Sequence, residues 1–134
     1  LDERLKKEDI TNAHLIHSRG EICLEDCFED QSLSRVFIFH PDPWFKKKHH
    51  KRRVVNTDFL NLLSRKMKDG GKLYLSTDVA LLWEEMAEIC HLHAHFQKVD
   101  DTQFWEDDYL SHWHEFSQED QRTLNCGVFE KKSN

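Results

Sequence analysis

A short stretch near the middle of the chain concentrates the residue types that could do chemistry. The run from His40 to Val55 reads HPDPWFKKKHHKRRVV, and in it one acid, Asp42, stands between two prolines. Six cations and two imidazoles then occupy the eight residues of Lys46–Arg53. Such cations can neutralise several phosphates, which supplies the salt-dependent part of nucleic-acid affinity. The intervening Trp44 and Phe45 could stack on a base or pack against the protein.

The overall charge hides this basic stretch. The 134 residues carry a net charge of −6, but residues 1–77 contain 15 Lys/Arg and 12 Asp/Glu, whereas residues 78–134 contain 4 and 13. An acidic protein with one dense basic stripe is expected to bind anions at one place only. A basic run by itself is also typical of a solvated loop or a localisation signal. The neighbouring Asp42 favours a functional site.

Two predicted strands would bring acids to the same edge of a sheet. Arg35–His40 (RVFIFH) is the β-branched and aromatic run of a buried parallel strand, and it ends at Pro41, which cannot continue a central strand. Lys72–Thr77 (KLYLST) is a second such strand, followed directly by Asp78. Ligands of parallel sheets bind beyond the carboxyl ends of the strands. We therefore expect Asp42 and Asp78 to share one rim.

The remaining pattern predicts an α/β fold with a mostly parallel sheet, because strands and helices alternate with short connections. The length suits one domain with a real core. Thr57 is the expected N-cap of a helix that stops at Gly70-Gly71, and Asp78 can cap the next helix. The other expected elements are a helix over 1–9, a strand over 12–18, a short helix over 20–28, an edge strand over 95–99, a loop-rich stretch over 100–123 and a last strand over 125–131.

Several classes of protein are disfavoured by the same sequence. No apolar run reaches the roughly 20 residues of a membrane span, and no signal-peptide pattern opens the chain, so a cytoplasmic protein is expected. The four cysteines form no CxxC pair and predict no disulfide framework. Imidazoles could ligate a metal, but alternating positions on a helix point to different faces, which favours surface histidines. The histidines concerned are His91, His93, His95, His112 and His114.

The basic run and its surroundings resemble the bacterial tRNA (guanine-N7-)-methyltransferase family. The run is similar to the family's PDPW-x-K-K-x-H-H-K-R-R signature, and Asp69–Lys72 followed by Thr77-Asp78 is similar to its x-G-G…T-D segment. Leu1–Gly20 resembles the family's helix and third strand. The resemblance implies a class I S-adenosylmethionine-dependent methyltransferase with a Rossmann-like α/β fold. Residues 1–134 would form a single partial domain with strands three to seven, lacking the first two strands and the N-terminal cofactor loop.

The resemblance also implies a reaction. This is methyl transfer from S-adenosyl-L-methionine to N7 of a guanine in tRNA, at the variable-loop guanosine of tRNA position 46, with this segment alone inactive. Ser117, Asp120 and Arg122 resemble the family's T-x-x-E-x-R. The implied roles are catalysis and cofactor contact for Asp42, substrate contact for Lys46, Asp78, Ser117 and Asp120, and RNA contact for Lys48, His49, His50, Lys51, Arg52 and Arg53.

Two departures from the family pattern concern the cofactor. Ser18-Arg19-Gly20 stands where the family has Gly-Asp-Ala, so Arg19 replaces a cofactor-binding acid and Glu21 is the candidate substitute. The chain has only four glycines, which cannot form the glycine-rich loop that cradles the cofactor. His40 also replaces the phenylalanine that usually precedes the motif.

The chemistry of guanine N7 suits these residues. Because N7 carries a free lone pair, methyl transfer needs no general base, and alignment of the reactants can contribute about 7–11 kcal/mol. Carboxylates at the base would stabilise the positive charge that develops on the purine. A helix-capping role is a nearly equal alternative for Asp78, and a turn-forming role is a weaker one for Asp42. Two rival functions remain: a non-catalytic RNA-binding fragment, and a histidine-based metal-binding or scaffold protein.

Overall fold

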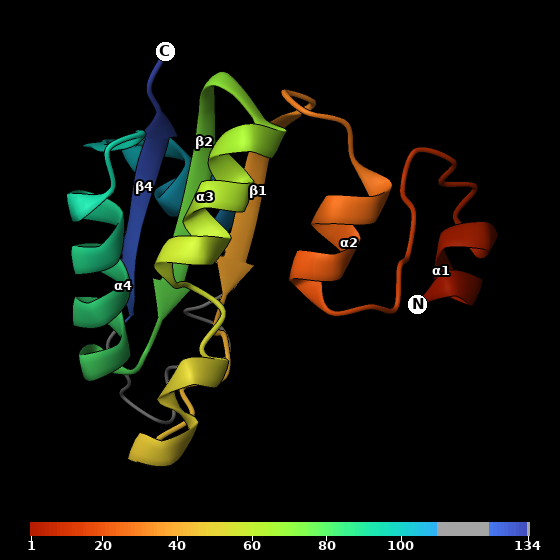
Figure 1. The fold of residues 1–134 in the computed structure, drawn as a ribbon. Coiled ribbons are helices and arrows are strands. Elements are labelled where there is room, and N and C mark those ends of the chain that lie inside the picture. Colours follow the sequence, from red (N-terminus) through yellow and green to blue (C-terminus); the bar gives the residue numbers. More distant parts are fainter. Residues whose placement is uncertain (110–123, 134) are drawn as a thin grey trace.

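The computed structural model describes residues 1–109 and 124–133, and its centre is a four-stranded sheet. The strands are β1 (Leu33–Phe39), β2 (Met67–Thr77), β3 (Phe96–Val99) and β4 (Asn125–Lys131), in the spatial order β1-β2-β4-β3. Figure 1 shows α3 (Thr57–Lys66) and α4 (Ala80–Leu92) covering one face of this sheet. The α/β class is therefore confirmed.

The sheet is less parallel than we expected. Only β1 and β2 run parallel, whereas β4 pairs antiparallel with both β2 and β3. The register explains the difference, because Val99 at the end of β3 lies opposite Val128, and Asn125 at the start of β4 lies opposite Thr77. The end of β3 and the start of β4 thus lie at the same end of the sheet, and β4 therefore runs antiparallel to β3 and β2.

The main core lies between the sheet and helices α3 and α4. Both helices present an amphipathic face, with buried residues at helical spacing. Leu60 and Leu63 on α3, together with Leu73 and Leu75 on β2, are completely buried. Burying one such side chain contributes roughly 1.5–3 kcal/mol, so this layer fixes the position and direction of β2 and of the residues that follow it.

The opposite face of the sheet carries an aromatic layer. Tyr74 of β2 is fully buried there, beside Trp105 of η2 (Phe104–Tyr109) and Val128 of β4. The Tyr74 hydroxyl donates a hydrogen bond of 2.5 Å to Asp101 Oδ2. Phe37 of β1 stacks on Tyr74 with ring centroids 4.8 Å apart, and it remains 44% exposed.

The segment before β1 departs from the prediction. Residues 12–18 form no strand; they are exposed and lie between α1 (Asp2–Lys7) and α2 (Gly20–Cys27). A strand needs a neighbour for its backbone groups, and in the described part of the chain β1 pairs with β2 alone. Figure 1 shows α1 and α2 to the side of the sheet, beyond β1.

The predicted helix caps also need correction. Asn56, not Thr57, caps α3, because its side-chain oxygen accepts a hydrogen bond of 2.9 Å from Phe59 N. Asp78 does not cap α4, whose N-cap is Val79 with no side-chain cap bond. Helix α3 ends at Lys66, before the glycine pair, because β2 already begins at Met67. No described helix is long and apolar enough to cross a membrane.

Candidate functional site

The ends of β1 and β2 bring two acids to one edge of the sheet. Phe39 lies opposite Ser76 in the parallel register, and His40 N donates a hydrogen bond of 2.8 Å to the carbonyl of Ser76. Asp42 comes two residues after His40, and Asp78 comes two residues after Ser76. His40 Nδ1 lies 3.8 Å from Asp78 Oδ1, which links the two strand ends through side chains as well. The shared edge predicted from the sequence is present.

The Pro-Asp-Pro turn holds the carboxylate of Asp42 in a defined direction. The amide of Trp44 donates a hydrogen bond of 3.0 Å to Asp42 Oδ1, and the Asp42 side chain is exposed. The turn lies between two non-glycine residues with positive φ, His40 at 50° and Trp44 at 44°. Such conformations cost of order 1–3 kcal/mol and persist only where surrounding contacts impose them. Strain of this kind commonly accompanies functional sites.

The basic segment, Lys46–Arg53, folds next to this turn. Residues Lys47–Arg52 form the 3-10 helix η1, and the side chains of Lys46, Lys48, Lys51 and Arg52 are exposed. The guanidinium of Arg52 lies 5.1 Å from the ring centroid of Trp44.

The two aromatic residues of the motif are placed differently. Trp44 is also in edge contact with His49, at 5.7 Å between ring centroids, so it packs within the segment. Phe45 is 73% exposed and is therefore the aromatic side chain available for stacking on a base.

Arg53 differs from the other five cations of the segment. Its side chain is only 12% exposed, and its Nε donates a hydrogen bond of 2.7 Å to the carbonyl of Pro43. Its Nη1 forms an ion pair with Glu85 on α4. Sequence reasoning did not single out Glu85. The only signal was its position about two helical turns beyond Asp78.

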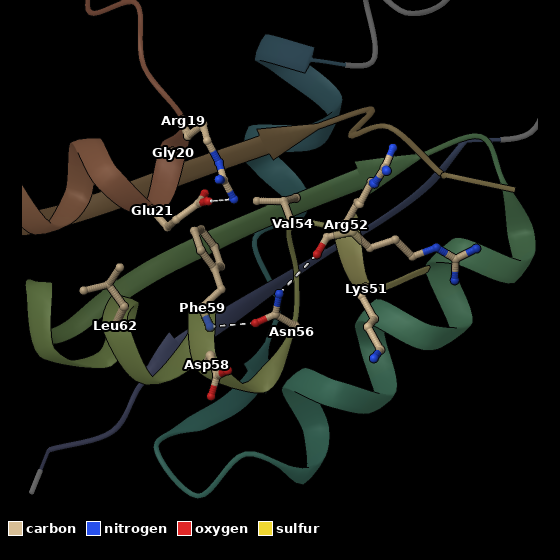
Figure 2. Close-up of a pocket in the computed structure, with 11 residues that line it drawn as sticks. Arg19, Gly20, Glu21, Lys51, Arg52, Val54, Asn56, Asp58, Phe59 and Leu62 are labelled. Carbon is tan, nitrogen blue, oxygen red and sulfur yellow. Dashed lines mark hydrogen bonds and ion pairs between the residues drawn. The ribbon is translucent and has the colours of Figure 1, made fainter. Parts of the chain in front are cut away.

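A cavity of about 530 Å³ lies between the start of α2 and the basic segment. Figure 2 shows the residues that line it. Arg19 and Glu21 on one wall form an ion pair, so the candidate cofactor acid is neutralised by the residue that departs from the family pattern. Phe59 and Leu62 of α3 supply an apolar part of the lining. The other residues around the cavity are Gly20, Lys51, Arg52, Arg53, Val54, Asn56 and Asp58.

The four glycines do not form a cofactor cradle. An added Cβ would lie 2.9 Å from the Lys68 carbonyl at Gly71 and 2.8 Å from the Trp83 ring at Gly127, so both are required for packing in β2 and β4. Gly70 has a φ of 80° that favours glycine, and Gly20 opens α2. Only Gly20 has open space where a Cβ would lie, so the four glycines do not together form a cradle for the nucleoside, and Asp42 and Glu21 could supply only part of a cofactor site.

The described histidines do not form a metal centre. His93 Nε2 lies 2.7 Å from Asn61 Oδ1, and His93 Nδ1 accepts a hydrogen bond of 3.2 Å from His95 N. Burial is the main cause that lowers the pKa of His93. Among residues 1–109 and 124–133, no three His, Cys, Asp or Glu side chains are grouped as metal ligands would be. The remaining predicted residues lie outside the described ranges, namely His112, His114, Ser117, Asp120 and Arg122.

Comparison with known proteins supports the family resemblance. Residues 1–132 match the family described as "Putative methyltransferase". A tRNA (guanine-N(7)-)-methyltransferase of Shewanella amazonensis is 43% identical over 94 residues, which cover 70% of this chain and 40% of that protein. A protein of the same name from Nitrosococcus oceani is 41% identical over 96 residues, covering 72% of this chain and 41% of its own length.

A solved structure shows the same fold. The crystal structure of a SAM-dependent O-methyltransferase from Thermotoga maritima matches 99% of this chain and 45% of that one, with a TM-score of 0.55 and 13% identity. The fold is therefore of the class I methyltransferase type. The chain spans about two fifths of the length of the curated relatives that it matches.

Proposed function

Because the chain belongs to this methyltransferase family, we propose that the full-length protein transfers a methyl group from S-adenosyl-L-methionine to N7 of a guanine in tRNA. The observation that carries the proposal is the placement of Asp42 and Asp78 at adjoining strand ends, next to a segment of exposed cations. Carboxylates beside phosphate-binding cations suit a substrate that combines a base with a polyanionic backbone.

The two acids of this chain would act on the base. The N–H groups of guanine can donate hydrogen bonds to a carboxylate. Asp78, which follows β2, is the proposed acceptor. Asp42, held by the Trp44 amide, would stabilise the charge that develops on the purine. Neither acid needs to remove a proton, since N7 attacks through its lone pair. The cofactor supplies the electrophilic methyl group, and most of its binding site would come from sequence outside this chain.

The basic segment would hold the tRNA. Its exposed cations can each contact a backbone phosphate, and Phe45 can stack on an unpaired base. The proposed RNA-binding residues are Lys46, Lys48, His49, His50, Lys51 and Arg52, with the target in the variable loop at tRNA position 46. A tRNA-modifying enzyme of this kind would act in the cytoplasm.

Replacing either acid by alanine tests the proposal. In the full-length protein, Asp42→Ala and Asp78→Ala should nearly abolish N7 methylation of an unmodified tRNA, measured as 7-methylguanosine by mass spectrometry of the digested product. Binding of tRNA should persist in both variants, because the basic segment is unchanged. Asp26→Ala, an exposed acid on α2, is the matched control and should keep wild-type activity. Rates within a few-fold of wild type in both variants would contradict the assignment, as would a wild-type product methylated elsewhere.

A further inference from the structure

One cation of the basic segment makes contacts that do not suit an RNA-binding residue. The Arg53 guanidinium is used twice inside the protein, once by the carbonyl of Pro43 and once by the carboxylate of Glu85. A side chain that is 12% exposed and already paired with a carboxylate has little capacity for a phosphate. Arg52, by contrast, is exposed and lies on the face of Trp44.

The two partners of Arg53 lie next to the two acids of the site, one beside Asp42 and the other on the helix that follows Asp78. Pro43 follows Asp42 directly, so its carbonyl fixes the turn that carries this acid. Glu85 lies on α4, the helix that begins two residues after Asp78. One guanidinium therefore ties the Asp42 turn to the helix that follows Asp78. The positive φ angles on both sides of the turn show that its conformation has to be imposed by such contacts.

We propose that Arg53 is a positioning residue, held by Glu85, that sets the Asp42 turn against Asp78 and does not contact the RNA. The inference rests on the proposed methyl transfer at these two acids. Arginine is required because the guanidinium donates through Nε and Nη1 to two acceptors in fixed directions, which the single ammonium of lysine cannot reproduce. A misplacement of about 1 Å at a reacting centre can lower the rate by roughly a hundredfold.

The test compares conservative variants of the full-length enzyme. Arg53→Lys should lower kcat by about ten- to a hundredfold, while the KM for tRNA and the salt dependence of tRNA binding stay at wild-type values. Glu85→Gln should lower kcat in the same direction but less, and the double variant should be no worse than Arg53→Lys, because both changes break one linkage. Glu84→Gln, an exposed neighbour on α4, is the matched control.

A second measurement does not depend on activity. Hydrogen exchange of the peptide that contains the Trp44 amide should accelerate in Arg53→Lys and Glu85→Gln, but not in Glu84→Gln, because the turn loses its anchor. If Arg53→Lys has a lower melting temperature, its loss of kcat does not distinguish positioning from instability. The kcat and the hydrogen exchange of Glu85→Gln then test the linkage.

Three results would overturn the inference. The first is a wild-type kcat in Arg53→Lys with weaker tRNA binding and a salt slope reduced by about 0.7–0.9, which identifies a phosphate contact. The second is unchanged kcat and unchanged exchange in both variants. The third is unchanged exchange with a lowered kcat. A wild-type enzyme that makes no 7-methylguanosine would instead contradict the proposed function, and the exchange experiment would still test the linkage.

Discussion

Removing three exposed cations from the basic segment should change how tRNA binding depends on salt. The triple variant Lys48→Gln, Lys51→Gln, Arg52→Gln leaves Arg53 and its contacts with Pro43 and Glu85 intact. Each phosphate contact contributes about 0.7 (single strand) to 0.9 (duplex) to the slope of log affinity against log salt. Loss of three contacts should therefore reduce the slope by about 2.1–2.7.

This difference in slope is large enough to measure directly. Between 50 and 200 mM salt, a slope difference of that size corresponds to a factor of about 20–40 in affinity. The wild-type full-length protein should lose that much more tRNA affinity than the variant over the same range, as followed by fluorescence anisotropy with labelled tRNA. The variant should also bind more weakly at the lowest salt.

A matched triple variant elsewhere separates local contact from total charge. Lys7, Lys68 and Lys98 are exposed lysines outside the segment, and replacing them with glutamine removes the same three charges. Their loss should leave the slope close to wild type. Equal slope changes in the two triple variants, or no change in the first, would refute a localised RNA contact at this segment.

Two further predictions concern stability. The hydrogen bond from Tyr74 is the main cause that lowers the pKa of Asp101 in the folded protein below its value in the unfolded chain. The Asp101 carboxylate therefore stabilises the fold above about pH 4, and this contribution is lost as the pH falls through the folded pKa. The stability difference between wild type and Asp101→Asn in urea unfolding should therefore shrink below pH 4. Residues 1–134 expressed alone should bind no cofactor detectably, and they should be unstable or self-associated through the exposed β1 edge. Calorimetry and gel filtration measure this, and a monomer that unfolds cooperatively and binds the cofactor would contradict it.

The parts of the fold that follow from local chemistry could be predicted. Strands were predicted at β1, β2 and β4, with β1 recognisable as a compact β-branched and aromatic run, and the proline after β1 marked the edge at which Asp42 lies. The first expected strand could not be judged in this way. Residues 12–18 contain the short apolar run Leu15-Ile16, but a strand also depends on a neighbour that lies elsewhere in space.

The sequence predicted that Asp42 and Asp78 follow adjacent strand ends, but it did not predict the contacts made by the basic segment. The six cations looked equivalent as a run, and only the approach of α4 to the turn separates Arg53 from the others. Likewise, Asn56 and Thr57 are both acceptable caps by type, and the backbone at Asn56, with φ −143° and ψ 173°, decides between them.

The position of β4 has a consequence for synthesis on the ribosome. Among the described strands β4 is made last, yet it lies inside the sheet between β2 and β3, where Lys72 pairs with Glu130. Until residues 125–131 emerge, β2 has a neighbour on one side only, and β3 has none among the described strands. Pairing across such long sequence separations is slow, and unpaired edges expose a nascent chain to aggregation. A deletion of residues 125–131 should therefore be far more damaging than its length suggests.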